Sequence, residues 1–253
     1  MPVRALKSFV SRMQPRAPSV PEGRRVYAVG DIHGRLDLLD RLLDMIADDD
    51  AARGDLRTEI VFLGDLIDRG PDSRGVVQRL LDYSRGPLPV RILMGNHEEV
   101  FLQALDGDQR ALRFLTRIGG RETILSYGVT AEEYRSLDYD ELGARVRAQV
   151  PAEHRDFLAG FERWVEVGDY LFVHAGLRPK VALEDQSPSD LRWIREEFLL
   201  HRESFGKMVV HGHSITEAVD ERTNRIGIDT GAFASGKLTA LGLESDRRWF
   251  LAT

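Results

Sequence analysis

The sequence contains no cysteine, so the fold has neither a disulfide nor a thiolate metal ligand. Any bound metal ion must therefore be held by oxygen and imidazole ligands, which suit Mn, Fe or Zn. The absence of cysteine also agrees with a reducing compartment, and we expect a cytoplasmic protein. No run of about 18 apolar residues occurs, so no transmembrane helix is expected.

The chain also lacks an excess of positive charge. It carries 35 Lys and Arg residues against 41 Asp and Glu residues, which gives a formal net charge of -6. Because a protein that follows a nucleic-acid backbone needs many exposed cations, this balance disfavours nucleic acid as a partner. The composition, 42% hydrophobic and 30% charged over 253 residues, is that of an ordinary globular protein with one large domain or two small ones.

Residues 1–24 form a basic N-terminal extension in which Glu22 is the only acidic residue. Apolar residues at helical spacing predict a small basic amphipathic helix over residues 3–13. A helix of that kind can contact an anionic membrane surface, but we favour a frayed or loosely docked extension. No continuous apolar core follows, so the segment does not resemble a secretory signal.

From Arg25 onward, short apolar runs alternate with amphipathic helices. The first three runs cover residues 26–29, 60–63 and 90–94, and each is followed directly by a glycine. Because strands buried on both faces read as continuous apolar runs, this alternation predicts a buried, largely parallel sheet flanked by helices.

Residues 99–165 interrupt this rhythm and are expected to form a helical cap. Its helices are expected at 98–106, 108–118, 131–148 with a break, and 152–163. Strands resume at 170–173 and 208–210, with a helix at 189–201 between them. Short strands with glycine turns in the tail, about 215–252, predict a second sheet packed on the first. We therefore expect an α/β fold of two packed β-sheets flanked by helices, with residues 25–253 as one domain.

Five turns that follow predicted strands carry the acidic and imidazole side chains. They lie at residues 30–34, 64–70, 95–98, 174–176 and 211–213, and they hold five of the seven histidines. A single Gly-Asp turn is usually no more than a strand exit. Five turns at one sheet edge are different, because ligands bind at the carboxyl ends of parallel strands and buried charged groups need partners. A pair of cations supplies such partners.

The motifs GDIHG, GDLIDRG, GNHE, HAG and GH, in this order, resemble the signature of the calcineurin-like metallophosphoesterases. Within that superfamily they resemble the phosphoprotein phosphatases, specifically the bacterial and phage-type serine/threonine phosphatases. The segment GGRETILSYG at 119–128 is also similar to one common in bacterial members. The resemblance runs from Gly30 to about Leu243 and implies an αββα sandwich, with the helical cap inserted at residues 99–165.

The resemblance implies a site for two divalent cations, Mn or else Fe or Zn. Such cations would hold a hydroxide that attacks a phosphate monoester. The implied ligands are Asp31 and His33 for the first metal, Asp65 for both, and Asn96, His174 and His213 for the second. His211 is interpreted as structural, because the family places its ligand at the second histidine of this turn. Asp229 lies in the tail that closes near the site and is a candidate for a supporting role.

The remaining roles concern the charge of the phosphate and the proton of the leaving group. Arg69 is the main candidate for binding phosphate oxygens, since a guanidinium forms a fork with phosphate that Lys cannot copy. Arg195 resembles a second phosphate-binding arginine of the phage-type enzymes, and Asn96 is also placed against the phosphate. His97 is expected to protonate the leaving group, with Asp68 holding its imidazole and raising its pKa.

These assignments predict a metal-dependent phosphomonoesterase, first of all a serine/threonine protein phosphatase that acts on phosphorylated proteins or peptides, with phosphotyrosine as a further substrate. A symmetrical diadenosine tetraphosphatase is the nearest alternative. Those enzymes share the fold and the metals, but they typically lack the acid at Asp68 and have Asp in place of Glu98. A non-catalytic metal- or phosphate-binding module is disfavoured because every motif ligand is present. A nuclease is disfavoured because Ile215 stands where such enzymes place another histidine.

Overall fold

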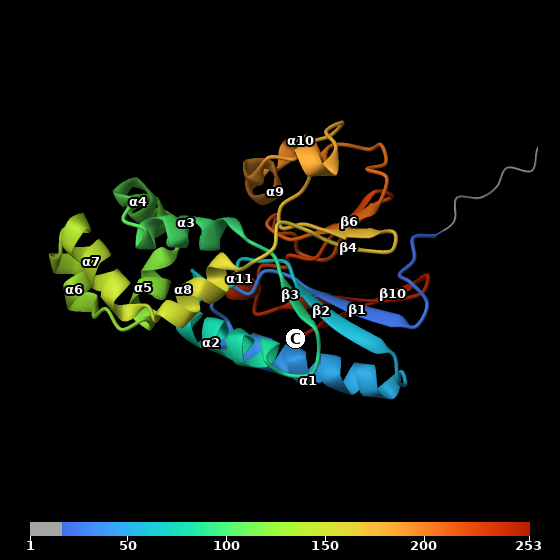
Figure 1. Cartoon of the computed structure of the whole chain (residues 1–253), viewed down its shortest axis with the longest axis horizontal. Coiled ribbons are helices and arrows are strands. Elements are labelled where there is room, and N and C mark those ends of the chain that lie inside the picture. The colour runs from blue at the N-terminus through green and yellow to red at the C-terminus, as the bar shows by residue number, and fades with distance from the viewer. Residues whose placement is uncertain (1–16) are drawn as a thin grey trace, which may run out of the picture.

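The computed structural model describes residues 17–253, and the helix predicted at residues 3–13 lies outside that range. Two five-stranded sheets pack face to face, with helices on their outer sides (Figure 1). The predicted α/β fold of two packed sheets is therefore confirmed. No helix in the described part of the chain has the length and apolar character that a bilayer-spanning segment needs.

The first sheet has the strand order β10-β9-β1-β2-β3. Its strands are β1 (Arg24–Val29), β2 (Arg57–Phe62), β3 (Val90–Ile92), β9 (Thr239–Glu244) and β10 (Arg247–Ala252). The first three run parallel, as predicted, whereas β9 and β10 are antiparallel. Two tail strands thus belong to the first sheet and not to the second. The helices α1 (Leu36–Ala52) and α2 (Ser73–Ser84) cover its outer face (Figure 1).

The second sheet has the order β4-β5-β6-β8-β7. Its strands are β4 (Val165–Val167), β5 (Tyr170–Phe172), β6 (Met208–His211), β7 (Asp220–Glu221) and β8 (Arg225–Gly227). A 3-10 turn (Leu183–Asp185) precedes the short helices α9 (Pro188–Trp193) and α10 (Glu196–Leu199). The single helix predicted at 189–201 is wrong, because the chain leaves the helical region at Arg195, where φ is -132° and ψ is -93°.

Both faces of the central strands are buried, which explains their continuous apolar sequences. Along β1, Val26 and Ala28 face the second sheet and pack with Phe172 and Val210. Tyr27 and Val29, on the opposite face of β1, belong to the larger core cluster with residues of α1 and α2. Because neighbouring residues of a strand point to opposite faces, one short strand anchors both layers.

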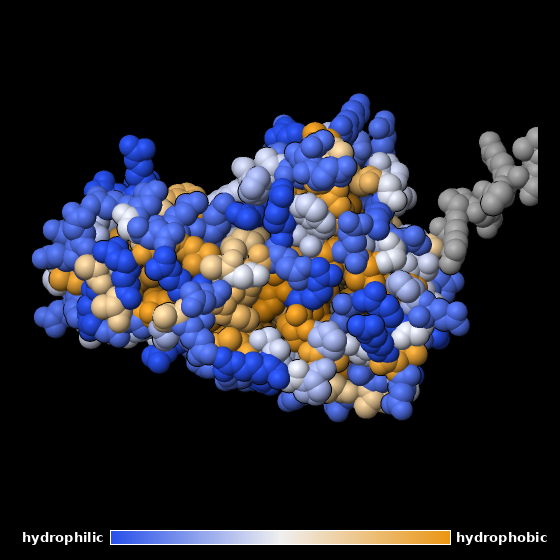
Figure 2. Space-filling view, viewed as in Figure 1, coloured by the Kyte–Doolittle hydropathy of each residue, from blue (hydrophilic) through white to orange (hydrophobic). Residues whose placement is uncertain are grey.

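The insertion forms a helical arm to one side of the sheets (Figure 1). Its helices are α3 (Asn96–Leu105), α4 (Gln109–Ile118), α5 (Gly120–Ser126), α6 (Ala131–Ser136), α7 (Tyr139–Gln149) and α8 (Ala152–Ala159). The sequence pattern does not predict α5, which starts directly after Gly119, a residue in the left-handed region. On the face seen in Figure 2, hydrophilic side chains dominate the surface of the arm, and hydrophobic atoms show between the arm and the sheets.

The start of the described chain is part of the folded body. Val20 is buried, and its N–H donates to the carbonyl of Ser245. Two arginines of the first strand are engaged within the fold. Arg24 forms an ion pair with Glu59, and the fully buried Arg25 binds acidic side chains of α1 and β9. The last residue of the basic extension therefore belongs to β1.

Candidate active site

All six predicted metal ligands meet at the carboxyl-end edge of the two sheets, and none is more than 6% exposed. They follow β1, β2, β5 and β6, or begin α3 after β3; these residues are Asp31, His33, Asp65, Asn96, His174 and His213. The register of the parallel strands explains the convergence, because β1 and β2 end side by side. The structure thus brings together the six side chains that the sequence analysis named.

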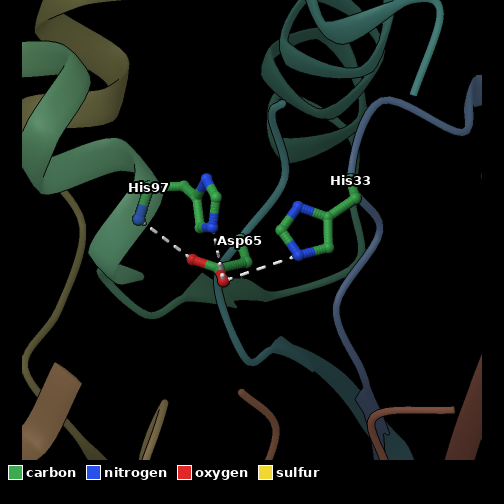
Figure 3. A group of neighbouring side chains, drawn as sticks. All are labelled: His33, Asp65 and His97. Carbon is green, nitrogen blue, oxygen red and sulfur yellow. Dashed lines mark hydrogen bonds and ion pairs between the residues drawn. The ribbon is translucent and has the colours of Figure 1, made fainter. Parts of the chain in front are cut away.

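The carboxylate of Asp65 lies at the centre of the cluster, between the rings of His33 and His97 (Figure 3). Its Oδ2 is 3.6 Å from Nε2 of His33, and its Oδ1 is 3.4 Å from Nε2 of His174. Two groups of side chains could each hold an ion: one contains His33, Asp65 and His97, the other Asp65, His174 and His213. Asp65 is common to both, as a bridging ligand must be.

The backbone at this edge is held in an unusual conformation. Among the described residues, seven that are not glycine have positive φ, and five of these lie in the site: His33, Asp65, Asp68, Arg69 and His213. The left-handed region is unfavourable for residues with a side chain. The strain is therefore concentrated where the strand ends turn their functional side chains inward.

The imidazoles are oriented and protonated as metal ligands require. The Nδ1 atoms of His33 and His174 each lie 2.8 Å from a backbone carbonyl, so they carry the proton and leave Nε2 unprotonated, with an electron pair that can bind a metal. Burial lowers the pKa of His33 to about 3 and that of His213 to about 2, so both rings are neutral near pH 7. Nε2 of His174 lies 3.0 Å from Oδ1 of Asn96. Both atoms are hydrogen-bond acceptors and neither can donate to the other, but both can bind one cation.

Buried polar atoms without hydrogen-bond partners supply an independent test of metal binding. They include Oδ1 of Asp31, Nε2 of His213 and Oδ2 of Asp229. Each such atom costs about 1–3 kcal/mol when no partner replaces water. Burial and the neighbouring carboxylates of Asp229 and Asp65 raise the pKa of Asp31, and burial raises the pKa of Asp229 to about 6. The donor set and its excess of buried acid therefore fit divalent cations.

The Gly-His turn after β6 is fitted closely to Asp31. The N–H of His213 donates to Oδ2 of Asp31 at 3.0 Å. A Cβ atom at Gly212 would lie 2.0 Å from Oδ1 of the same carboxylate. Only glycine allows this approach, and it joins the second sheet to the first at the site. His211 lies outside both ligand groups, since its ring packs on Phe198 and its Nε2 lies 3.3 Å from the Arg225 guanidinium.

The predicted proton donor and its partner carboxylate are also adjacent. Nδ1 of His97 lies 2.6 Å from Oδ2 of Asp68. Burial opposes a charged imidazolium, but the carboxylates of Asp65 and Asp68 outweigh it and raise the pKa of His97. The other oxygen of Asp68 accepts a hydrogen bond from the hydroxyl of Thr123 in α5. The Asp68 N–H also donates to this hydroxyl and to that of Ser73.

Arg69 reaches the centre of the site from the same turn. Its guanidinium nitrogens lie 3.0 Å from Nε2 of His33 and 3.1 Å from Nε2 of His97. Its backbone N–H donates to the carbonyl of Gly119 at 2.9 Å, and Gly119 has a φ of 112°. A Cβ atom at Gly119 would lie 2.6 Å from Cγ of Arg69. Gly119 and Thr123 are positioning residues that the sequence analysis missed, although the motif at 119–128 pointed to their segment.

Arg195 lies at the break between α9 and α10 and is exposed. Its guanidinium contacts the hydroxyl of Ser214 at 3.4 Å, next to His213, and it forms no ion pair with any residue in the described range. Arg192, one turn earlier, is instead bound to Glu99, which also accepts from the indole of Trp193. Of the two arginines, Arg195 is therefore the one available to a substrate.

Glu98 has a structural role, as predicted. Its buried carboxylate accepts hydrogen bonds from the N–H groups of Asp65, Leu66 and Gly95 at 2.9, 2.8 and 3.1 Å. These contacts join the turn after β2 to the start of α3. Burial and the nearby charge of Asp65 raise the pKa of Glu98 to about 8. Glu98 thereby sets the position of the central carboxylate.

Comparison with known proteins places this geometry among phosphoesterases. The model of the calcineurin-like phosphoesterase family matches residues 24–231. A bis(5'-nucleosyl)-tetraphosphatase, symmetrical, from Acidovorax sp. (strain JS42) is 34% identical over 160 residues, which are 63% of this chain and 47% of that protein. One of the same name from Neisseria gonorrhoeae (strain NCCP11945) is 25% identical, with 87% of this chain and 92% of that protein covered.

The chain thus spans about half the length of the first of these relatives and most of the second. Among solved structures, the cold-active protein-tyrosine phosphatase of a psychrophile, Shewanella sp., superposes with a TM-score of 0.54 at 20% identity. The match covers 92% of this chain and 83% of that one. At this identity the likeness shows a shared fold.

Proposed function

This chain belongs to the calcineurin-like phosphoesterase family, and we propose that it is a metal-dependent hydrolase of bis(5'-nucleosyl) tetraphosphates. The observation that supports the hydrolytic site is the pair of ligand groups that share Asp65. The names of the Acidovorax and Neisseria relatives support the choice of substrate. They favour the alternative from the sequence analysis over its first interpretation, a protein phosphatase.

We assign the first cation to Asp31, His33 and Asp65, and the second to Asp65, Asn96, His174 and His213. His97 belongs to the first ligand group by distance, but its Nδ1 is bound to Asp68 and we assign it to proton donation. The rings of His33 and His174, whose Nδ1 atoms carry the proton so that Nε2 keeps an electron pair, and the partnerless oxygen of Asp31 support this assignment. Two divalent cations held there would neutralise the phosphate charge and supply a nucleophile at neutral pH. Oxygen and imidazole ligands are compatible with Mn, Fe or Zn.

The arginines bind and orient the phosphate. Arg69 presents two guanidinium nitrogens beside His33 and His97, so it can form a bidentate contact with phosphate oxygens. Arg195 approaches from the side of His213. Because a tetraphosphate extends over several phosphoryl groups, two arginines on different sides of the ligand cluster suit it.

His97 is placed to hold the proton that the leaving group takes up. With Nδ1 bound to Asp68, the imidazolium can donate only from Nε2, which points toward Asp65 and Arg69.

This arrangement also supports a second candidate function. The leaving alkoxide of a phosphoserine needs a proton far more than the leaving phosphate of an anhydride does. The intact pair of His97 and Asp68 is therefore the observation that favours a protein phosphatase.

A substrate panel separates the two candidates. Protein stripped of metal and reloaded with Mn should be compared on diadenosine tetraphosphate and on phosphoserine, phosphothreonine and phosphotyrosine peptides. We expect preferential, metal-dependent cleavage of the dinucleotide. Products consisting of ADP alone would indicate symmetrical cleavage, and AMP with ATP would indicate asymmetrical cleavage. Preference for the peptides would replace the proposed function with the second candidate.

A further inference from the structure

A groove of about 690 Å³ opens directly beside the candidate active site, at the N-terminal ends of α1 and α2. Its lining includes Arg35, Asp37, Asp40, Arg69, Asp72 and Phe233. Apart from Arg69, none of these residues has a role in the site described above. A volume of this size accommodates a group as large as a nucleoside.

Arg69 and Phe233 connect the groove to the reaction centre. The Arg69 guanidinium contacts Nε2 of both His33 and His97. The ring of Phe233 lies edge-on to the His33 ring, with the centroids 5.4 Å apart, and Arg69 lies 4.9 Å from the centroid of the same ring. A group attached to a phosphate on Arg69 would therefore meet Phe233 as it enters the groove.

The backbone around Phe233 is fixed before any ligand arrives. Phe233 belongs to the short helix α11 (Ala232–Ser235), which follows Gly231 in the left-handed region. The N–H of Gly231 donates to Asp229 at 2.9 Å, and the Arg35 guanidinium donates to the carbonyl of Ala232 at 2.9 Å. The backbone that carries the ring is thus held by Asp229 and by Arg35, next to the N-terminus of α1, while the ring stays partly exposed.

The charges of the groove favour a neutral group over further phosphates. Asp37 and Asp40 are paired with Arg35 and Arg79, yet their side chains are 61% and 49% exposed. Exposed carboxylates repel a polyphosphate chain but accept hydrogen bonds from hydroxyl groups. An aromatic ring beside hydroxyl acceptors matches the two parts of a nucleoside, because the base stacks on the ring and the ribose donates to the carboxylates.

We propose that this groove binds the substrate's nucleoside nearest to the reacting phosphate, and that Phe233 is the platform for its base. The proposal rests on the proposed function in that it assigns the groove to a nucleotide substrate. It names a subsite and a specificity-determining residue.

The test uses AMP and inorganic phosphate as competing inhibitors of 4-nitrophenyl phosphate hydrolysis by the Mn-loaded full chain. We expect AMP to bind the wild type at least about tenfold more tightly than phosphate. Phe233→Leu keeps an apolar side chain of similar volume but removes the ring, so it should raise the inhibition constant of AMP about tenfold. The constant for phosphate should change by less than about twofold. Phe250→Leu, at an exposed aromatic residue of β10, is the matched control and should change neither constant.

Several results would overturn the proposal. Equal inhibition of the wild type by AMP and phosphate would mean that no nucleoside subsite exists. An equal rise of both constants in Phe233→Leu would mean that the ring acts only by supporting Arg69 and His33. A rise in KM for a phosphopeptide with an unchanged AMP constant would assign the groove to a peptide.

The inhibition experiment is independent of the proposed function. If the wild type fails to cleave diadenosine tetraphosphate but Phe233→Leu selectively weakens AMP binding, the proposed function fails and the subsite stands. If the dinucleotide is cleaved while AMP binds no better than phosphate, the subsite fails and the function stands. Phe233→Tyr, which keeps the ring, should bind AMP like the wild type and serves as a second variant if Phe233→Leu does not fold.

Discussion

The hydroxyl of Thr123 donates a hydrogen bond to the carboxylate of Asp68, whose other oxygen binds Nδ1 of His97. Thr123 belongs to the helical insertion, whereas Asp68 follows a strand of the first sheet, and 55 residues separate the two in the chain. The insertion therefore orients the proposed proton donor through Asp68. Through Gly119 it also supports Arg69.

Replacing Thr123 with Val should lower kcat with little change in KM. The substitution preserves the shape of the side chain but removes the hydroxyl, so Asp68 loses one hydrogen bond that fixes its orientation. A general acid contributes about 10²–10⁴-fold to rate, and we expect about a tenfold loss from its misplacement. Steady-state kinetics on a phosphoserine peptide would measure the effect. Thr123→Ser should keep most of the activity, and full activity of Thr123→Val would contradict the positioning role.

Replacing Asp65 with Asn should abolish activity and weaken the loading of both metals. The carboxylate is the one group common to both ligand clusters. Burial alone would raise its pKa, but the surrounding imidazoles, His174 most of all, lower it. Metal content after gel filtration, together with turnover, would measure both effects. Asp246→Asn, at an exposed carboxylate, is the matched control. Retention of two tightly bound metals by the Asp65 variant would rule out the bridging assignment.

Replacing His97 with Ala should affect substrates according to their leaving groups. Turnover of phosphoserine peptides should fall by about 10²-fold or more, because an alkoxide needs the proton. Turnover of 4-nitrophenyl phosphate and of diadenosine tetraphosphate should fall much less, since their leaving groups are weaker bases. Parallel kinetics on the three substrates would compare the losses. Equal losses on all of them would show that His97 has a role other than proton donation.

Replacing Gly119 with Ala should weaken phosphate binding. Its φ of 112° costs a residue with a side chain about 1–2 kcal/mol, and the added Cβ would displace Arg69. Gly206→Ala is a matched control, because Gly206 has a φ of 85° and no atom lies within 4 Å of the new Cβ. Both variants should lose stability in thermal unfolding, but only Gly119→Ala should raise KM. If both variants raised KM alike, the contact between Gly119 and Arg69 would not contribute to phosphate binding.

The stability contributed by Asp49 should depend on pH. Burial alone would raise the pKa of Asp49, but hydrogen bonds from Arg53, Tyr27 and Trp249 outweigh burial and lower it. A carboxyl group with a depressed pKa in the folded state stabilises the protein above its unfolded pKa of about 3.9, and this contribution is lost as the pH falls through the folded pKa. Asp49→Ala should therefore destabilise the protein by about 1–2 kcal/mol at pH 7.

Urea unfolding of the wild type and of Asp49→Ala at a series of pH values would measure this difference. The gap between the two proteins should narrow as the pH falls below about 4. A constant gap would mean that Asp49 contributes through packing and not through its charge.

The sequence by itself determined which side chains gather at the candidate site. Each ligand follows a strand directly, and parallel strands bring their carboxyl ends to one edge, so local order along the chain was enough to collect Asp65 and its neighbours. The position of Glu98 at a helix start predicted its structural role, and the family resemblance predicted the same for His211. The sequence favoured a protein substrate because of Asp68 and Glu98, but both reactions need the same candidate ligands, so the motif turns alone do not separate a protein from a dinucleotide substrate.

Only the tertiary structure decided which distant residues support the site. Thr123, Gly119 and Phe233 reach it from segments that no local pattern links to the motif turns. The spacing of apolar residues likewise did not predict that the helix breaks at Arg195 or that β9 and β10 join the first sheet. Side-chain spacing reports which face of an element is buried, but not which partner covers it. The groove beside Phe233 exists because α11 meets the N-terminal ends of α1 and α2 there.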